Sequence, residues 1–198
     1  MTSLLYIITM IRTVVNTASL LGWSWIAFHT IQAILADNPA GEDLLQVVLI
    51  AQVVCASETL QIAFGILRGD LALSFVVQYT RLMMYFITFP HTSVSSDVVK
   101  TILLAWSLTE MARFPMVLFP KSKNLRTIRY AVPLITFPMG AGTEAYAAYL
   151  VFLTTENMLL KAALGLIVLV NVVGGTVWYP GMVKKVTRSL KGEKKKAK

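Results

Sequence analysis

The sequence predicts an all-α membrane protein, a polytopic bundle of six transmembrane helices. Of its 198 residues, 56% are hydrophobic and only 14% are charged, whereas about 25% of the residues are charged in an ordinary soluble domain. The apolar residues gather in runs that are long enough to cross about 30 Å of hydrocarbon as helices. These runs lack the alternation of apolar and polar residues that is typical of a membrane-spanning strand. A helical bundle is therefore the expected class.

The helices are expected near residues 13–35, 44–67, 71–90, 98–120, 130–153 and 158–183. The connections between them are short and rich in turn-forming residues, such as Asp37-Asn38-Pro39-Ala40-Gly41 and Arg68-Gly69-Asp70. At this length one domain is expected. We assign it to residues 1–183 and treat 184–198 as a basic C-terminal tail.

Basic residues are distributed unequally between the two ends of the predicted bundle. The segments on the side of the termini hold the tail lysines and Arg68, Lys121, Lys123, Arg126 and Arg129, while the opposite loops hold Asp37, Glu42, Asp43, Asp97 and Glu156. Because basic loops stay on the cytosolic side, we expect both termini in the cytosol or the mitochondrial matrix. The net charge of +8 belongs to this topology and does not indicate nucleic-acid binding.

The tail ends in Lys194-Lys195-Lys196-Ala197-Lys198. Lys195 and Lys196 stand where a cytosolic dilysine signal for retrieval to the endoplasmic reticulum is found. The alternative is a polybasic segment that contacts anionic membrane lipids, at about 1 kcal/mol per charge. The two interpretations are compatible with each other.

The residue types that bind metals are sparse. Cys55 is the single cysteine, which excludes an internal disulfide and a cysteine-rich metal site. His29 and His91 are far apart and near predicted helix ends, where we interpret them as interfacial residues. No metal site is predicted.

Five ionisable residues fall inside the predicted helices: Glu58, Arg81, Glu110, Arg113 and Glu144. Such a residue in hydrocarbon costs about 2.5–3.5 kcal/mol on insertion scales. Glu110 and Arg113 are three residues apart and share a helix face. Glu58 and Arg81 lie on consecutive predicted helices and can meet across the bundle. Their spacing alone does not decide whether these four residues are structural charged pairs or part of a site.

Glu144 has no basic residue within one helical turn. One interpretation places it at a helix end, where it would reach water. However, apolar or small residues precede it and Ala145 to Leu153 follow it, which favours a buried position. A carboxyl group in a low-dielectric interior suits a general acid or base that works near neutral pH.

The segment Trp106-Ser107-Leu108-Thr109-Glu110-Met111-Ala112-Arg113-Phe114 resembles a W-S-x-x-E-x-x-R-Y signature. That signature belongs to the membrane-bound 3-hydroxyacyl-CoA dehydratases, a family once described as protein-tyrosine-phosphatase-like. The similarity extends in the same order over nearly the whole chain, through Gly22-Trp23-Ser24, Gln78-Tyr79-Thr80-Arg81 and Pro138 to Glu144, and on to Tyr179.

The resemblance implies a six-helix enzyme of the endoplasmic reticulum that uses no metal or cofactor. Such enzymes remove water from a (3R)-3-hydroxyacyl-CoA in very-long-chain fatty-acid elongation, giving the trans-2-enoyl-CoA. The family's catalytic pair is a Tyr and a Glu in Y-P-x-G-x-x-x-E. Glu144 matches the Glu, but position 137 is Phe, which cannot donate a hydrogen bond. Tyr146, two residues beyond Glu144, is a candidate to supply the missing hydroxyl.

Two functions are consistent with these residues. The first is a pseudoenzyme, a structural or lipid-binding subunit of a membrane complex, in the endoplasmic reticulum or the mitochondrial inner membrane. The second is an active dehydratase that acts on long-chain acyl-CoA beside the elongase enzymes. Loss of a positioned proton-transfer group costs about 10²–10⁴-fold in rate, which favours the first. A transporter is disfavoured because the sequence lacks inverted-repeat symmetry.

Overall fold

The computed structural model describes residues 2–65, 70–119, 121–184 and 186–187, and the regular elements within them are all helical. The all-α class is thus confirmed. The elements in chain order, with two π-helical turns η1 and η2, are α1 (Thr2–Leu35), α2 (Glu42–Ala63), α3 (Leu71–Met83), η1 (Met84–Thr88), α4 (Ser96–Leu118), α5 (Lys123–Ala131), α6 (Pro133–Thr154), α7 (Met158–Val173) and η2 (Gly174–Trp178).

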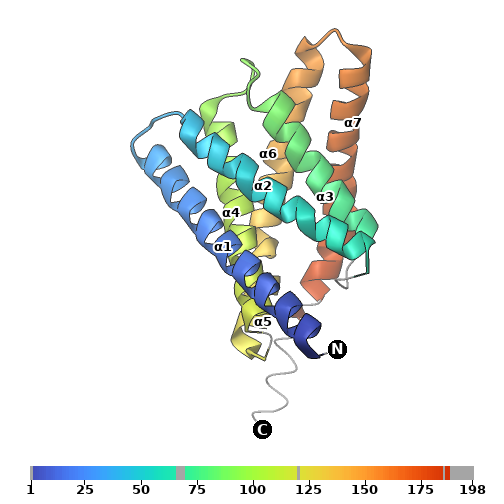
Figure 1. Ribbon diagram of the computed structural model, residues 1–198. Helices are drawn as coiled ribbons and strands as arrows, with labels where there is room; N and C mark the ends of the chain where they lie inside the picture. The colour runs from blue at the N-terminus through green and yellow to red at the C-terminus, as the bar shows by residue number, and fades with distance from the viewer. Residues whose placement is uncertain (1, 66–69, 120, 185, 188–198) are drawn as a thin grey trace.

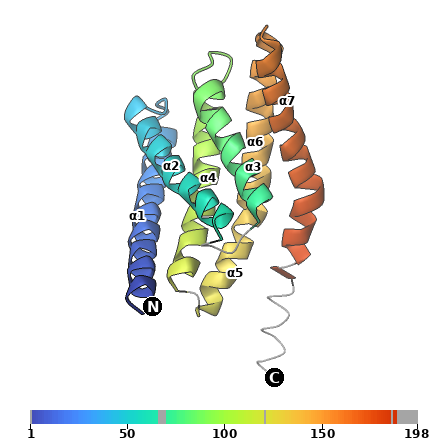
Figure 2. The ribbon, with the colours of Figure 1, turned by 45° about the vertical axis from the view of Figure 1, so that its right-hand side comes forward.

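Four helices, α1, α4, α6 and α7, form a row in which each packs on the next (Figure 2). α2 and α3 cover this row on one side (Figure 1), where α2 packs on α1 and α3, and α3 also contacts α7. The short α5 lies at the end of the bundle where α1 begins. As a result, α4 and α6 have helical neighbours on several sides, and residues on them can be shielded from lipid.

Short polar side chains begin four of the helices, because each accepts a hydrogen bond from a backbone N–H that has no partner within the helix. These side chains are Asp70 before α3, Ser95 before α4, Ser122 before α5 and Asn157 before α7. All four lie in predicted connections. The turn-forming residues of the sequence therefore mark helix starts at the expected places.

Two expected helices have different limits in the structure. The one expected near 130–153 is divided, since α5 ends at Ala131 and α6 begins at Pro133. Proline lacks a backbone N–H, so it interrupts the helical hydrogen bonds and tends to stand in the first turn of a helix. α1 begins at Thr2 instead of near residue 13, because no Gly or Pro precedes Gly22. Arg68, Lys195 and Lys196 lie outside the described residues.

Within the described residues, four segments are long and apolar enough to cross a membrane. They are Thr13–Leu35, Glu42–Ala63, Leu71–Thr88 and Met158–Lys184. α4 and α6 have 23 and 22 residues, which at about 1.5 Å per residue also matches the hydrocarbon thickness. They carry three ionisable residues, Glu110 and Arg113 on α4 and Glu144 on α6. The two helices in the middle of the row thus each carry a buried carboxyl group, Glu110 on α4 and Glu144 on α6.

Four ionisable residues of α2, α3 and α4 form one network. Glu110 lies between two guanidinium groups: its Oε1 is 2.7 Å from Arg81 Nη1 and its Oε2 is 2.8 Å from Arg113 Nε. Arg113 Nη1 is in turn 2.9 Å from Glu58 Oε2. The expected pairing of Glu58 with Arg81 is thus replaced by Glu58 with Arg113 and Arg81 with Glu110. The reason is that Arg81 and Arg113 each lie against one oxygen of the Glu110 carboxylate, and Arg113 has a further nitrogen that pairs with Glu58.

Aromatic rings surround the most buried cation of this network. The guanidinium carbon of Arg81 lies 5.8 Å from the ring centroid of Trp23 and 5.4 Å from that of Trp106. Cation–π contacts of this kind gain strength where water is excluded, and Arg81 is only 6% exposed. The rings and Glu110 together compensate for the water that the guanidinium loses on burial.

We expect Glu110→Gln to destabilise the protein by about 3–5 kcal/mol, because two guanidinium groups then face one carboxylate in a low-dielectric interior. Glu110→Gln combined with Arg81→Met should recover much of this loss, since it removes the buried cation as well. Thermal unfolding in mild detergent measures both effects, with Glu156→Gln at an exposed position as the control. Equal losses in the single and double variants would show that the charges are not coupled.

Candidate functional site

Glu144 lies in the middle of α6 and is only 7% exposed. Its Oε1 accepts a hydrogen bond of 2.6 Å from the indole Nε1 of Trp106 on α4. Its Oε2 accepts a longer one of 3.4 Å from Asn171 Nδ2 on α7. None of the ion pairs formed by the described residues involves Glu144. The carboxyl group is therefore held between two neutral donors from the helices on either side.

Trp106 joins Glu144 to the charge network. Its indole N–H donates to Glu144, while its ring face lies 5.4 Å from the guanidinium of Arg81. Arg81 in turn pairs with Glu110, one helical turn beyond Trp106 on α4. The ion pairs thus fix the plane of the Trp106 ring, and that ring fixes one oxygen of Glu144.

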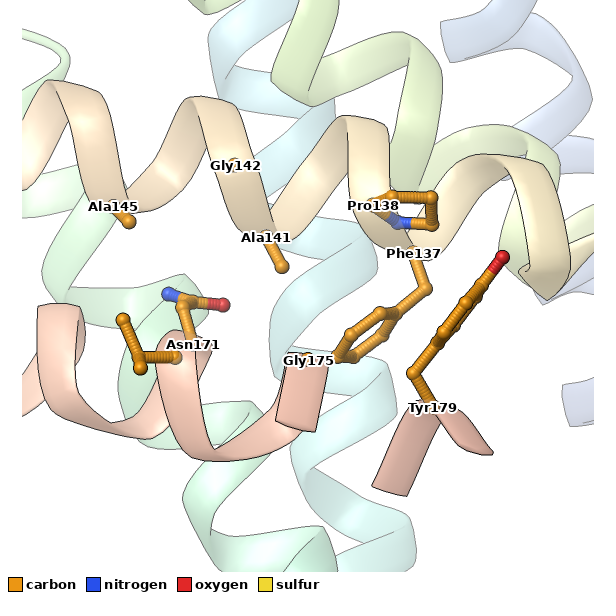
Figure 3. Close-up of a pocket in the computed structure, with 9 residues that line it drawn as sticks. Phe137, Pro138, Ala141, Gly142, Ala145, Asn171, Gly175 and Tyr179 are labelled. Atoms are coloured by element: carbon orange, nitrogen blue, oxygen red, sulfur yellow. The ribbon is translucent and has the colours of Figure 1, made fainter. Parts of the chain in front are cut away.

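A cleft of about 280 Å³ opens between α6 and the C-terminal part of α7 with η2 (Figure 3). Its walls are mostly small or apolar, and Asn171 contributes the amide. The lining residues are Phe137, Pro138, Ala141, Gly142, Ala145, Asn171, Val172, Gly175 and Tyr179. Glu144 is not among them. Since Asn171 both lines the cleft and donates to Glu144, the carboxyl group lies behind this amide.

Phe137 stands at one end of the cleft, where its ring stacks on that of Tyr179 with centroids 6.1 Å apart and an 18° angle between planes (Figure 3). The tip of the Phe137 ring rests against Gly174, the first residue of η2. A Cβ at Gly174 would lie 2.8 Å from Phe137 Cζ, which is too close without movement. Gly174 therefore allows α7 to approach α6 at this ring.

The hydroxyl of Tyr179 is engaged with the backbone of α6. It donates to the carbonyl oxygen of Leu134 at 3.0 Å, and Figure 3 shows the hydroxyl directed toward that helix. In a regular helix this carbonyl would accept from the N–H four residues later. That residue is Pro138, which has no N–H. Tyr179 thus satisfies the carbonyl that Pro138 leaves without a helical partner.

Tyr146 does not occupy the position expected of a substitute hydroxyl donor. It is 53% exposed and does not line the cleft. Two residues along a helix correspond to a rotation of about 200°, so Tyr146 and Glu144 leave α6 on different sides. The role of Tyr146 as a substitute donor stays a prediction, and the structure places this side chain away from the cleft.

Three residues that build the site were not singled out by sequence reasoning for these roles: Trp106 and Asn171 as donors to Glu144, and Tyr179 as donor to Leu134. Asn171 has a recognisable signal, because it is the first polar side chain after Lys161 in an apolar run and polar groups in such helices mark functional or packing sites. Among the described residues no group of three or more His, Cys, Asp or Glu side chains could hold a metal ion.

A family model described as protein tyrosine phosphatase-like protein, PTPLA, matches residues 52–196. The chain belongs to this family. It is the 3-hydroxyacyl-CoA dehydratase family, as the motif around Trp106 and Glu110 predicts. The matched segment contains the whole charge network, the cleft and Glu144. No solved structure matches the chain.

For this dehydratase-family member we expect Tyr179→Phe to cost about 1–3 kcal/mol, since it leaves the partly buried Leu134 carbonyl without a donor. In a Pro138→Ala background the same change should cost much less, because the N–H of the new residue can bond to that carbonyl. Thermal unfolding in detergent measures the stability of the unchanged protein, the two single variants and the double variant, which together form a double-mutant cycle. Tyr149→Phe, at a half-exposed position of α6, is the control. A cost that is equal in both backgrounds contradicts the assignment.

Proposed function

We propose that this protein is a dehydratase-fold membrane protein with little or no catalytic activity, which serves as a structural or lipid-binding subunit of a membrane complex. One observation carries the proposal. At position 137, where the family resemblance expects a catalytic Tyr, the side chain is Phe, and the hydroxyl of the neighbouring Tyr179 is already used by Leu134. The part of the cleft beside Phe137 therefore lacks a free tyrosine hydroxyl.

The chemistry explains why this matters. Elimination of water from a 3-hydroxyacyl thioester requires a base for the proton next to the carbonyl and a donor for the departing hydroxyl. Glu144 retains the carboxyl group, but both of its oxygens accept hydrogen bonds from Trp106 and Asn171. The base is thus constrained and its partner is missing. A loss of about 10²–10⁴-fold in rate is typical for one such group.

The cleft supports the lipid-binding part of the proposal. A volume of about 280 Å³ between α6 and α7, with mostly apolar walls, suits a length of hydrocarbon chain better than a polar ligand. Gly142 and Gly175 line the cleft and add no side chain to its walls. The protein can thus hold an acyl chain without performing chemistry on it.

A second function, an active dehydratase of fatty-acid elongation, is favoured by the intact surroundings of Glu144. Trp106, Arg81 and Glu110 hold the carboxyl group through a continuous set of contacts. If water in the cleft replaces the missing donor, long-chain 3-hydroxyacyl-CoA is the substrate. The two proposals differ in one measurable quantity, the rate of dehydration.

We also propose that all six long helices cross the membrane, with both termini on the cytosolic or matrix side. The lengths of α4 and α6 support this topology, and so does the separation of charge between the two ends. The endoplasmic reticulum is favoured by the family and by Lys195 and Lys196, and the mitochondrial inner membrane is the alternative for a subunit of a larger complex.

The purified protein should show little or no dehydration of a long-chain 3-hydroxyacyl-CoA in reconstituted liposomes. Phe137→Tyr restores the hydroxyl with one added oxygen atom and should give partial activity. Glu144→Gln in that background should abolish it again. Formation of the enoyl thioester is followed by mass spectrometry, and Phe137→Leu serves as the control without a hydroxyl. Rapid turnover by the unchanged protein would establish the second function.

The topology predicts that Asn38→Cys and Glu156→Cys are labelled from one side of a sealed vesicle and Lys121→Cys from the other. A membrane-impermeant maleimide measures this in a Cys55→Ala background. The α1–α2 turn and α5 lie at opposite ends of the bundle (Figure 1), so a six-span chain must separate them. Labelling of Asn38→Cys and Lys121→Cys from the same side would exclude the arrangement.

A further inference from the structure

The segment before α6 is strongly basic. Residues 121–130 read KSKNLRTIRY, with four basic residues and no acidic one. On α5, positions 123, 126 and 129 are three residues apart and follow one face of the helix. Leu125 and Ile128 lie on another face. The segment thus has the pattern of a basic amphipathic helix, which is typical of a contact with a membrane surface.

The basic residues at the start of α5 oppose the helix dipole, whereas Arg129 lies in the last turn, where a cation is favourable. α5 has no acidic residue in its first turn, and Lys123 begins it. The positive end of the helix dipole lies at this N-terminus, so basic side chains near it are unfavourable. The start of the segment is therefore not arranged for the stability of α5, and an anion bound beside it would offset the unfavourable interaction of these cations with the helix dipole.

The rest of the described structure does not supply such an anion to Lys121 or Arg129. The ion pairs of the described residues involve Arg81, Lys100 and Arg113. Lys121 is exposed, and Arg129 Nη1 contacts the neutral Sδ of Met116 at 3.4 Å. These two cations are available to a partner outside the described chain.

The position of α5 identifies this partner. α6 has 22 residues, about 33 Å at the helical rise, which matches the hydrocarbon layer. The nine residues of α5 precede it directly and extend about 13 Å further, through the depth of the lipid headgroups. Ile128 is 46% exposed, and Tyr130 has the amphipathic ring that is enriched at this level. In the proposed six-span topology, on which this inference rests, the basic side chains lie at the depth of lipid phosphates.

We propose that the segment of residues 121–130 is a binding site for the headgroups of anionic phospholipids. Lys121 and Arg129 supply charge to the lipid phosphate, and the apolar face of α5 remains on the hydrocarbon side. The site is independent of the cleft and of whether the protein is catalytically active. A basic residue near an anionic surface typically strengthens binding about five-fold.

The test uses the full-length protein in detergent and short-chain lipids, with bound lipid counted by native mass spectrometry. Dioctanoyl phosphatidylserine should bind more tightly than dioctanoyl phosphatidylcholine. Lys121→Gln combined with Arg129→Gln should weaken phosphatidylserine binding about 25-fold and leave phosphatidylcholine unchanged. Lys161→Gln, at the opposite end of the bundle, is the matched control and should have no effect.

A charge-preserving variant separates charge from folding. Lys121→Arg with Arg129→Lys should retain the preference for phosphatidylserine, whereas a requirement for the original side chains would contradict a headgroup site. The proposal is overturned if the neutral double variant keeps the preference, or if Lys161→Gln removes it equally. Competition by inorganic phosphate or coenzyme A at the lipid's own concentration would assign the site to a soluble phosphate instead.

Discussion

The bundle depends on one buried carboxylate, that of Glu110. Each of its two oxygens pairs with a cation, Arg81 on α3 and Arg113 on its own helix. Arg113 also pairs with Glu58 on α2. A buried charge is tolerated in a low-dielectric interior only when it is paired and its partners are fixed. Because Arg81 also lies on the ring of Trp106, this constraint extends to Glu144 on α6. The charged residues therefore set the geometry of the candidate site from several helices away.

A second constraint comes from Pro138. It removes the N–H that would bond to Leu134, and Tyr179 supplies the replacement. Tyr179 also stacks on Phe137, and the tip of the Phe137 ring fits against Gly174 because this residue has no side chain. The π-helical turn η2 begins at this glycine, at the point where α7 approaches α6. One proline thus explains why the cleft is lined by these aromatic residues and why its tyrosine hydroxyl is committed to the backbone.

These two constraints affect function differently. The charge network holds Glu144 as an acid–base residue would have to be held, whereas the contacts around Pro138 leave an apolar ring at position 137. A fold that keeps its carboxyl group and its apolar cleft but lacks a free hydroxyl beside Phe137 is well suited to holding a lipid. We propose that it eliminates water slowly or not at all. The combination is the basis for proposing a subunit of low activity within a family of dehydratases.

Composition and apolar runs determined the all-α class and the approximate positions of the helices, and the motif around Trp106 and Glu110 indicated the family, because these depend on local pattern. The spacing of Glu110 and Arg113 placed them on one face for the same reason. Only the tertiary structure decided that Glu58 pairs with Arg113, that Trp106 and Asn171 hold Glu144, and that Tyr146 points elsewhere. Helical periodicity specifies which side of a helix a residue occupies, but it does not specify which neighbouring helix will be there. The partners of a buried polar group are set by that packing.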